Sequence, residues 1–489
     1  KKPLEAHFTG DKNGKVELHS QKEVEELVNK LKNEKFEVLS VKNGERRKKP
    51  PLPFTTSTLQ QEASKRLNMS TQKTMRLAQE LYEGVTLKGK GSVGLITYLR
   101  TDSTRISEEA DASCREYIAQ QYGEQFVGDK TAVKSSKTGK IQDAHEAIRP
   151  TYLDQLPIKV KESLSRDQFR LYQLIWNRFV ASRMKEAVYE TTNIKIEAAG
   201  YLFTVSTSRL AFEGFMSVYK PDDEKAENNV LARKINNDSQ LSFKDFDAKQ
   251  HFTQPPAHYT EASLVKTLEE LGIGRPSTYA PTITTIIARR YVAKENKNLY
   301  VTELGEVVNR MMVQSFPSIV DVNFTANLEY LLDKVGEGVV NYKTVIRNFY
   351  PDLDEAVQKA EKELEEVKIE DEVSDVQCDQ CGRMMVIKYG PHGKFLACPG
   401  FPECRNTKPY LEKIGVPCPV CGKEVVIRKT KKGRKYYGCE DNPECEFMSW
   451  QKPSSKKCPE CGGYMVEKGN KLVCADEKCG YVETIKKED

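Results

Sequence analysis

Residues 94–107 (Gly-Leu-Ile-Thr-Tyr-Leu-Arg-Thr-Asp-Ser-Thr-Arg-Ile-Ser) contain two side chains that could do covalent chemistry together. Tyr98 offers a phenol, and Arg100 places a guanidinium two residues further along. Free tyrosine has a pKa of about 10, so a nucleophilic tyrosine needs nearby positive charge or hydrogen-bond donors. Arg100 could supply that help, or bind a phosphate under attack through its fork of N–H donors. Taken alone, a Tyr-x-Arg pair more often marks a packed tyrosine beside a surface arginine.

A second group of candidate side chains is His145, Glu146 and Arg149. On a helix His145 and Arg149 would share a face, whereas Glu146 would point elsewhere. Histidine exchanges a proton near neutral pH, and arginine is a good anchor for a phosphate. The pattern indicates proton transfer and anion binding, with an ordinary polar helix surface as the alternative.

The elements around Tyr98 can be predicted from local patterns. Residues 93–99 predict a short buried strand, and the polar residues 101–104 favour a turn. A helix is expected to begin after Ser107, with two glutamates in its first turn. Upstream, capped helices are expected from about residue 56 and from Ser70 to near Gly84, which together suggest a helix-turn-helix element.

A further pair of helices is predicted after residue 255. Thr260 should cap a helix with an apolar stripe made by Leu264, Val265, Leu268 and Leu271. Residues 272–274 (Gly-Ile-Gly) should end it, and Ser277 or Thr278 should cap the next helix. A capped helix start after Arg275 would offer N–H groups, hydroxyls and a guanidinium to a phosphate. Tyr279 could stack on a base or pack inward.

Twelve of the 13 cysteines lie in the last part of the chain, in three sets that each begin with Cys-x2-Cys and continue with a second pair that has four or five residues between its members. Each set of four predicts two knuckles around a tetrahedral structural zinc, without an open position for catalysis. Zinc would replace the core that a domain of this size cannot build. The sets are Cys378, Cys381, Cys398 and Cys404; Cys418, Cys421, Cys439 and Cys445; and Cys458, Cys461, Cys474 and Cys479.

Charge is distributed unevenly along the chain. Residues 376–489 carry 21 Lys and Arg against 15 Asp and Glu, a balance of +6, whereas residues 1–375 carry 55 against 56. Any attraction of the first region for DNA must therefore come from local patches. Three zinc sites, each with four thiolates and a net charge of −2, would cancel the +6 of the second region.

Basic and aromatic residues alternate in the cysteine-rich region, a pattern that suits single-stranded DNA. About half of these rings are expected to belong to the core. The residues are Lys429, Lys431, Lys432, Arg434, Lys435, Tyr436 and Tyr437, with further rings at Phe395, Phe447, Trp450 and Tyr464.

The chain has no apolar run of the roughly 18–20 residues that a membrane span needs, and no signal peptide. Clustered cysteines without a secretory signal indicate metal binding in a reducing cytosol. The first residues, Lys-Lys-Pro, suggest that an upstream segment has been removed.

Residues 94–107 closely resemble the active-site segment of type IA DNA topoisomerases, in which a tyrosine attacks a DNA phosphodiester. The segments at 54–61, 144–151 and 255–280 resemble the same family. The resemblance covers nearly all of the chain but begins partway into the family's sequence. The cysteine-rich repeats favour bacterial topoisomerase I over topoisomerase III.

The resemblance implies roles for individual residues. Tyr98 would be the nucleophile and Arg100 its phosphate-binding partner. His145 would either aid proton transfer or bind the scissile region. The implied DNA contacts are Arg100, Asp102, Ser103, Thr104, Arg149, Arg275, Ser277, Thr278 and Arg289. Two positions depart from the family pattern: His258 stands where arginine is usual, and Arg290 where glycine is common. Neutral histidine cannot replace a permanent cation, which puts a phosphate contact at His258 in doubt.

The fold expected from the resemblance is a multidomain α+β protein with a toroidal core, made of a β-rich arch and helical helix-turn-helix-like domains. Three zinc ribbons would follow it. The arch would comprise 1–57, ending in a basic connector at 45–51, together with 185–254; the helical domain with the tyrosine would be 58–184. The single-strand-binding helical domain would be 255–370, ending in a solvated helix and linker, and the ribbons 376–412, 416–453 and 456–486.

The family also uses Mg²⁺, held by acidic residues of an N-terminal TOPRIM domain. No convincing copy of that acidic motif is found, since Asp245-Phe246-Asp247 lacks the final acid and residues 352–355 lie in a helical pattern. The chain is therefore expected to be a fragment that is inactive by itself. The whole enzyme is expected to act on DNA at the nucleoid, in the bacterial cytoplasm.

The implied partners are single-stranded segments of negatively supercoiled DNA, bound by a monomer, and RNA polymerase is a further candidate partner for the ribbons. The rival reading is a non-catalytic, single-stranded nucleic-acid-binding zinc-ribbon protein.

Overall fold

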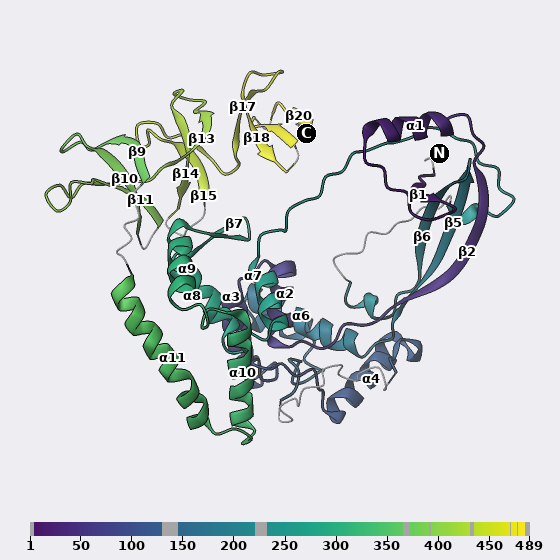
Figure 1. The fold of residues 1–489 in the computed structure, drawn as a ribbon, viewed down its shortest axis with the longest axis horizontal. Helices are drawn as coiled ribbons and strands as arrows, with labels where there is room; N and C mark the ends of the chain where they lie inside the picture. Colours follow the sequence, from purple (N-terminus) through teal and green to yellow (C-terminus); the bar gives the residue numbers. More distant parts are fainter. Residues whose placement is uncertain are drawn as a thin grey trace. The chain divides into compact units, whose positions relative to one another are not determined.

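The structure is a computed structural model that describes residues 4–129, 145–220, 232–364, 372–390, 393–430, 435–469, 471–476 and 478–484. Contacts divide the chain into two compact units, residues 1–365 and 366–489. Both are drawn in Figure 1. Part of the basic and aromatic stretch, at residues 431–434, lies outside the described residues.

The first unit contains a long antiparallel sheet with strand order β1-β6-β5-β2 (Figure 1). Its elements are β1 (His7–Asp11), α1 (Gln21–Leu31), β2 (Glu37–Lys48), β5 (Ala187–Ala198) and β6 (Tyr201–Phe212). One end of this sheet has its own small core, in which Leu31 of α1 packs with Ile194, Ile196 and Phe203. Strands β5 and β6 both lie within residues 185–254, the segment expected to be the second part of a β-rich arch. The predicted connector at 45–51 is wrong in part, because residues 45–48 pair with β5 as the end of β2.

A helical region lies between the two halves of the sheet in sequence. Its elements are α2 (Thr56–Leu67), α3 (Thr71–Glu83), β3 (Val85–Leu87), β4 (Gly91–Val93), α4 (Glu108–Tyr122), η1 (Glu124–Phe126), α5 (Pro157–Val160), η3 (Lys161–Ser163), α6 (Arg166–Ser182) and η4 (Gly214–Ser217). The largest hydrophobic core of the protein is here, built around Phe54, Leu59, Tyr172 and Phe179. Thr55, Ser70 and Ser107 accept backbone N–H bonds as N-caps, which confirms the predicted helix starts.

A second helical region follows the short helix η5 (Ala232–Lys234). It comprises α7 (Glu261–Glu270), α8 (Tyr279–Ala288), β7 (Val292–Glu295), β8 (Asn298–Val301), α9 (Glu303–Ser315), α10 (Val322–Gly336) and α11 (Tyr342–Glu363). Thr260 caps α7 as predicted, and Val265 is fully buried against Tyr279 and Ile283. Leu271 was expected on the same apolar stripe, but it is 45% exposed because the helix ends there and the chain turns at Gly272.

Two carboxylates, one buried and one half-buried, attach α7 to the helices that precede the tyrosine. Glu261 is 5% exposed, and its Oε2 accepts from the backbone N (2.7 Å) and Oγ1 (2.9 Å) of Thr71. Its Oε1 pairs with Lys294 Nζ at 2.5 Å. Near the other end of α7, Ser57 Oγ donates to Glu269 Oε2 at 2.5 Å. These polar contacts fix the position of α7 relative to α2 and α3.

The second unit consists of antiparallel four-stranded sheets, one for each set of cysteines. The first contains β9 (Glu372–Gln377), β10 (Met384–Gly390), β11 (Gly393–Ala397) and β12 (Thr407–Pro409). The second contains β13 (Glu412–Pro417), β14 (Glu424–Lys429), β15 (Lys435–Cys439) and β16 (Met448–Ser449). The third contains β17 (Pro453–Lys457), β18 (Tyr464–Lys468), β19 (Lys471–Cys474) and β20 (Val482–Thr484). The mixed α+β fold with ribbon-like C-terminal modules is as expected.

No helix among the described residues is long and apolar enough to cross a membrane.

Glu261→Gln is expected to destabilise the packing of α7 on α2 and α3 by about 1–3 kcal/mol, because buried donors lose a charged acceptor. Burial alone raises the pKa of Glu261, but hydrogen bonds from Lys294 and Thr71 outweigh it and leave the pKa lowered. This stabilisation is therefore present above the unfolded pKa of Glu261 and is lost as pH falls through the lower folded pKa.

Urea unfolding of the wild type and of Glu261→Gln, followed at pH 7 and near pH 4, measures this effect. The matched control is Glu190→Gln, since Glu190 pairs with Arg209 on the surface and both side chains are more than half exposed. Equal effects of the two substitutions at pH 7 would contradict the prediction.

Candidate active site and metal centres

The segment that carries Tyr98 is held by backbone hydrogen bonds to distant parts of the chain. Leu95 N donates to Leu81 O at 2.8 Å, and Thr97 N donates to Arg149 O at 3.0 Å. Leu95, Ile96 and Leu99 are buried, whereas Tyr98 is 39% exposed. The predicted strand over 93–99 is wrong: β4 ends at Val93, and beyond it only an isolated bridge joins Ile96 to Pro150. The apolar side chains are buried as expected, but they anchor an irregular segment.

Two rings flank the phenol of Tyr98. The Tyr82 ring lies edge-on, with its centroid 5.5 Å from that of Tyr98. The His145 ring lies 5.8 Å away at an interplanar angle of 52°. The structure thus brings His145 to Tyr98 from a separate segment, as the resemblance implied. Tyr82 was not predicted; its place at the end of the helix before Gly84 was the only signal in the sequence.

Arg100 and Asp102 project to solvent beside a buried hydrogen-bonded anchor. Thr56 Oγ1 donates to Leu99 O at 2.6 Å, and Thr56 N donates to Thr101 O at 2.9 Å. Both Arg100 and Asp102 are exposed, and neither forms an ion pair within the part of the chain that is described. The Arg100 guanidinium is thus available to an anion near Tyr98.

The remaining residues of the predicted turn differ in exposure. Ser103 is fully buried, and its Oγ accepts from Arg105 N at 3.1 Å. Its hydroxyl therefore supports the loop instead of facing a ligand. Thr104 is half-buried.

His145, Glu146 and Arg149 lie outside any helix, and isolated β-bridges form at Ile148 and Pro150, so the helix considered for this segment is not formed. Residues 147–149 are held by separate segments: Ala147 N donates to Arg105 O, and Ile148 N to Phe54 O, both at 2.8 Å. Glu146 also reaches Arg149, with Oε2 2.7 Å from Nη2. The Arg149 side chain is 13% exposed and is neutralised by this pair, so it is a supporting cation at most.

The start of α8 differs from the predicted phosphate site. Arg275 Nη2 pairs with Asp333 Oδ2 at 2.6 Å, and Nη1 lies 3.6 Å from Glu329 Oε2, both on α10. Thr278 occupies the N-cap position without a capping bond, because its Oγ1 accepts from Arg275 N at 2.8 Å instead. Ser277 and Arg289 are exposed.

Tyr279 packs inward, the second of its two predicted alternatives. It is 6% exposed, and burial raises its pKa to about 12.

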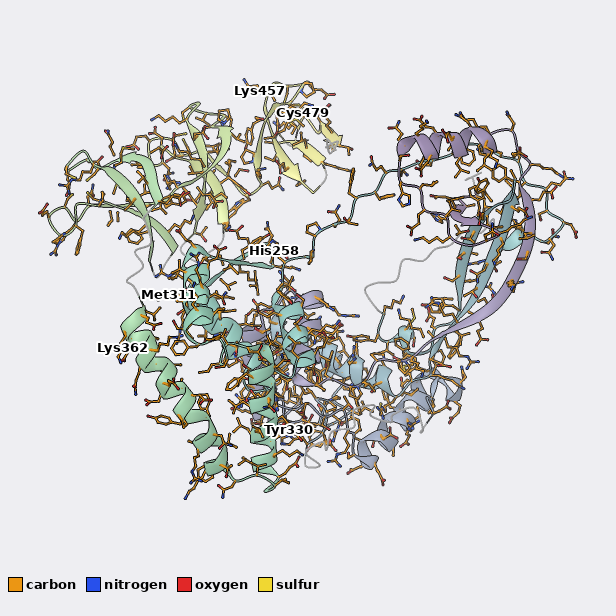
Figure 2. The ribbon with its side chains drawn as sticks, viewed as in Figure 1. His258, Met311, Tyr330, Lys362, Lys457 and Cys479 are labelled. Atoms are coloured by element: carbon orange, nitrogen blue, oxygen red, sulfur yellow. The ribbon has the colours of Figure 1, made fainter. Side chains whose placement is uncertain are left out.

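The two departures from the family pattern have local explanations. His258 is exposed, and its ring centroid lies 4.3 Å from that of Tyr300 (Figure 2). Arg290 has φ +61°, a left-handed conformation that favours glycine. This geometry accounts for the glycine that is common at that position.

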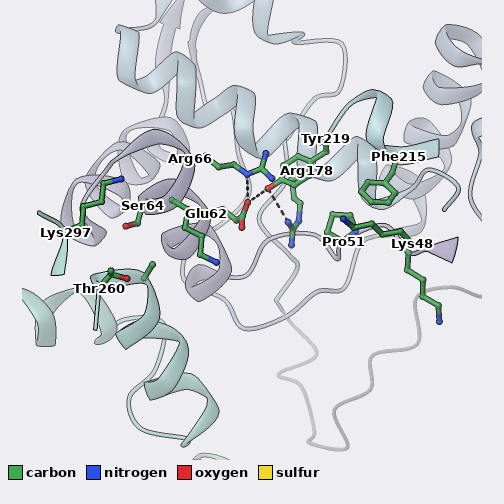
Figure 3. A pocket seen from close by; sticks show the side chains of 13 residues that line it. Lys48, Pro51, Glu62, Ser64, Arg66, Arg178, Phe215, Tyr219, Thr260 and Lys297 are labelled. Atoms are coloured by element: carbon green, nitrogen blue, oxygen red, sulfur yellow. Dashed lines mark hydrogen bonds and ion pairs between the residues drawn. The ribbon is translucent and has the colours of Figure 1, made fainter. Parts of the chain in front are cut away.

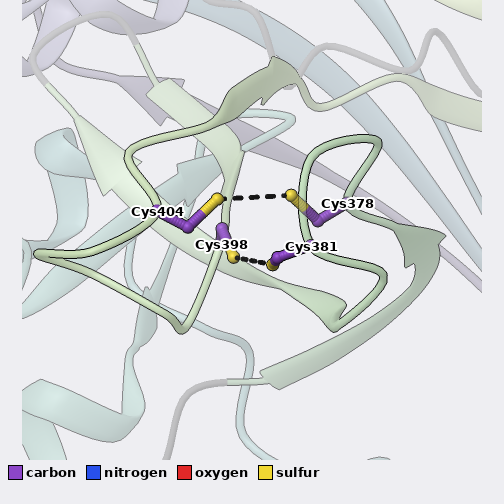
Figure 4. Close-up of side chains that lie close together, drawn as sticks. All are labelled: Cys378, Cys381, Cys398 and Cys404. Carbon is purple, nitrogen blue, oxygen red and sulfur yellow. Dashed lines mark hydrogen bonds between the residues drawn. The ribbon is translucent and has the colours of Figure 1, made fainter.

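Each set of four cysteines forms a compact cluster whose Sγ atoms lie within 4.8 Å of one another. In the first, Cys378 and Cys404 are 3.6 Å apart and Cys381 and Cys398 3.3 Å apart (Figure 4). A tetrahedral zinc with Zn–S bonds of about 2.3 Å requires sulfur separations of about 3.8 Å. The twelve predicted ligands therefore make three four-cysteine zinc sites. The thirteenth cysteine, Cys114, is fully buried, and burial raises its pKa to about 12.

The aromatic rings near the zinc sites divide between core and surface. Phe447 is 8% exposed and contacts Tyr464 edge-on, with centroids 5.4 Å apart, so this pair joins the second ribbon to the third. Trp450 is 47% exposed, and its ring centroid lies 6.0 Å from that of Tyr436. The last two rings are the better candidates for stacking on bases.

Within the described ranges, the cysteine sets are the only groups of His, Cys, Asp or Glu found close enough together to hold a metal ion. Asp352 and Asp354 lie on α11, and Asp245 and Asp247 lie in an extended segment. These aspartates do not form a magnesium site, and none of them is assigned as a magnesium ligand.

Comparison with known proteins gives a consistent result. A family model described as DNA topoisomerase matches residues 4–347. The chain belongs to the bacterial type IA DNA topoisomerases. A second model, described as the topoisomerase DNA-binding C4 zinc finger, matches residues 375–413, 415–454 and 455–488.

A solved structure agrees with these family matches. The full-length topoisomerase I from Thermotoga maritima is 34% identical, with a TM-score of 0.59. The match covers 82% of this chain and 63% of that one.

We expect Gly94→Ala to disturb the Tyr98 segment. A Cβ at Gly94 would lie 2.7 Å from the carbonyl oxygen of Tyr82, so the two segments must separate. Such overpacking costs about 1–3 kcal/mol. Thermal unfolding should show the loss. Gly336→Ala on α10 is the matched control, because a Cβ there meets nothing within 4 Å. Equal melting temperatures for Gly94→Ala and the wild type would contradict the expectation.

Metal analysis of the purified chain should yield three zinc ions, one for each cysteine set. Removing them with a strong chelator should unfold the ribbons, because zinc replaces a core in modules of this size. Hydrogen exchange should then increase in residues 372–484, while the helices of the first unit stay protected. Fewer than three zinc ions, or ribbons that stay protected without metal, would contradict the assignment.

Proposed function

We propose that this chain is the tyrosine-bearing and DNA-binding part of a type IA topoisomerase that relaxes negatively supercoiled DNA without ATP. The observation that carries the proposal is the setting of Tyr98. It is an exposed phenol on a buried, hydrogen-bonded segment, with a free guanidinium two residues away and His145 beside it. An exposed nucleophile on a rigid support is what attack on a large polymeric substrate requires.

In the proposed reaction, Tyr98 Oη attacks a phosphorus atom of single-stranded DNA. The bond from phosphorus to the 3′ oxygen breaks, and a 5′-phosphotyrosyl bond forms. His145 takes the phenol proton, and the departing 3′ oxygen takes a proton from solvent water and leaves as a 3′-hydroxyl. Arg100 binds the non-bridging oxygens of the phosphate, where negative charge develops.

Strand passage precedes the reverse reaction, in which the 3′-hydroxyl attacks phosphorus and releases Tyr98. One ester is exchanged for another, so relief of supercoiling supplies the driving force. Mg²⁺ would be held by acidic residues of a TOPRIM domain, as in the family.

The proposed DNA contacts follow the exposure of each residue. Arg100, Asp102 and Thr104 lie beside Tyr98, while Ser277 and Arg289 present polar groups at the two ends of α8. Arg275 would need to exchange Asp333 for a phosphate, and Arg149 acts through its support of the segment next to His145. The ribbons would hold a single strand by stacking on Trp450 and Tyr436.

Further details of the proposal concern assembly and location. The protein would act as a monomer at the bacterial nucleoid in the cytoplasm, where its substrate lies. RNA polymerase is a candidate partner for the ribbons.

The second candidate function is non-catalytic binding of single-stranded DNA. It is favoured by the lack of an acidic metal cluster among the described residues, since the chain would then bind DNA without cleaving it.

Tyr98→Phe is expected to abolish covalent attachment to DNA, because phenylalanine has no oxygen nucleophile. The wild-type chain is incubated with a labelled single-stranded oligonucleotide and Mg²⁺, with and without a separately added TOPRIM domain, and then denatured and separated on a gel. The wild type should give a covalent adduct when the acidic domain is added.

Tyr82→Phe is the matched control, since it removes a neighbouring phenol while the ring contact with Tyr98 remains. It should form the adduct. Adduct formation by Tyr98→Phe would overturn the assignment of the nucleophile. Binding without adduct in every mixture would support the second candidate.

A further inference from the structure

A basic pocket whose lining does not include Tyr98 lies where several segments of the first unit meet. It has a volume of about 580 Å³, within the range of roughly 300–1,000 Å³ that is typical of ligand sites. One side is formed by the end of β2 and the residues after it, another by α2, α6 and the residues following η4. Thr260, Ala262 and the turn between β7 and β8 complete it (Figure 3).

The lining of this pocket is strongly positive. It contains six cationic side chains and a single carboxylate, that of Glu62; the cations are Lys48, Lys49, Lys65, Arg66, Arg178 and Lys297. Residues 1–375 as a whole carry 55 basic and 56 acidic side chains. The pocket is therefore a local concentration of positive charge in a region without a net excess, which is where an anion would be attracted.

The floor of the pocket is a preorganised hydrogen-bonded network. Glu62 Oε2 accepts from Arg66 Nε and from Tyr219 Oη, each at 2.6 Å. Arg178 donates to Leu52 O at 2.6 Å and to Tyr219 Oη at 3.3 Å. The Tyr219 ring is 4% exposed and lies 4.2 Å from the Arg66 guanidinium carbon. Glu62 thus pairs with Arg66, and the Tyr219 hydroxyl connects this pair to Arg178, so both guanidiniums are held in place.

The rim differs from the floor because its lysines are not engaged. Lys49, Lys65 and Lys297 are exposed, and none forms an ion pair or side-chain hydrogen bond within the described ranges. The guanidiniums of the floor are fixed, and the ammonium groups of the rim are exposed. This arrangement suits a phosphodiester backbone that enters the pocket and continues beyond it. A small anion would not need cations spread around the mouth.

We propose that this pocket binds the phosphodiester backbone of a DNA strand, at a site separate from the phosphate that Tyr98 attacks. The inference rests on the DNA-binding part of the proposed function. A phosphate seated on the Arg66 and Arg178 floor would be within reach of lysines from β2, α2 and the β7–β8 turn. It would thereby connect the end of β2, the helices α2 and α6, and the region of α7 and the β7–β8 turn.

Lysine acetylation tests the site in the full chain. The protein is treated with an acetylating reagent with and without a single-stranded oligothymidylate, and each lysine is quantified by mass spectrometry. Lys65 and Lys297 should be protected by DNA. Lys42 and Lys195, which are exposed on β2 and β5 away from the pocket, should react equally in both samples.

The outcomes separate this inference from the proposed function. Protection of lysines elsewhere in residues 1–365, but not of Lys65 and Lys297, would overturn the pocket alone. A lack of protection throughout residues 1–365 would overturn both the pocket and a DNA-binding role for the first unit.

A salt titration provides an independent measurement. For single strands, the slope of log K against log salt is about −0.7 for each phosphate contact. The double variant K65Q/K297Q should therefore have a slope shallower by about 1.4 than the wild type. The matched variant K42Q/K195Q loses the same charge and should keep the wild-type slope. Equal slopes for the two double variants would overturn the proposal.

Discussion

The candidate active site depends on hydrogen-bond partners for the buried backbone N–H and C=O groups of the irregular segment around Tyr98, which does not belong to a sheet. Buried N–H and C=O groups need partners, and a strand ordinarily finds them in a neighbouring strand. Around Tyr98 they come from Leu81, Arg149 and Thr56 instead, which lie on an α-helix, a segment outside any helix and a helix start. Because the support comes from several directions, Leu95, Ile96 and Leu99 can be buried while the intervening Tyr98 faces outward. A regular strand covered on both faces would have buried this side chain as well.

The same support places His145 next to Tyr98. The segment after His145 donates to Phe54 and Arg105 and accepts from Thr97, so it lies beneath the tyrosine segment over several residues. Glu146 then neutralises Arg149 at the edge of this arrangement. Of the two arginines, Arg100 is therefore the one without an ion pair among the described residues, and Arg149 contributes by fixing the backbone.

Local signals in the sequence predicted the helices well, because an N-cap is a contact between residues three apart. Thr55, Ser70, Ser107 and Thr260 all cap the helices that follow them. The zinc ligands were equally predictable, since each knuckle is set by its own spacing. Residues 93–99 and 145–149 were mispredicted because their conformation is set by partners in separate segments, from 14 residues away (Leu95 and Leu81) to 94 residues away (Ile148 and Phe54).

Tyr82 and the basic pocket could not be predicted for a related reason: their neighbours come from separate elements. The ion pair between Arg275 and Asp333 joins α8 to α10 across 58 residues in the same way.

Charge balance explains why arrangement matters more than net charge in this protein. Four thiolates around each zinc would offset the basic excess of residues 376–489, and the first unit has no excess. Part of the aromatic surface is also committed, because Phe447 and Tyr464 join two ribbons. Within the described residues, the proposed places for a nucleic acid are Arg100 beside Tyr98, the pocket around Arg66 and Arg178, and the exposed ring of Trp450. Separated anchors of this kind fix the path of a strand, whereas a uniformly basic surface would bind it in many registers.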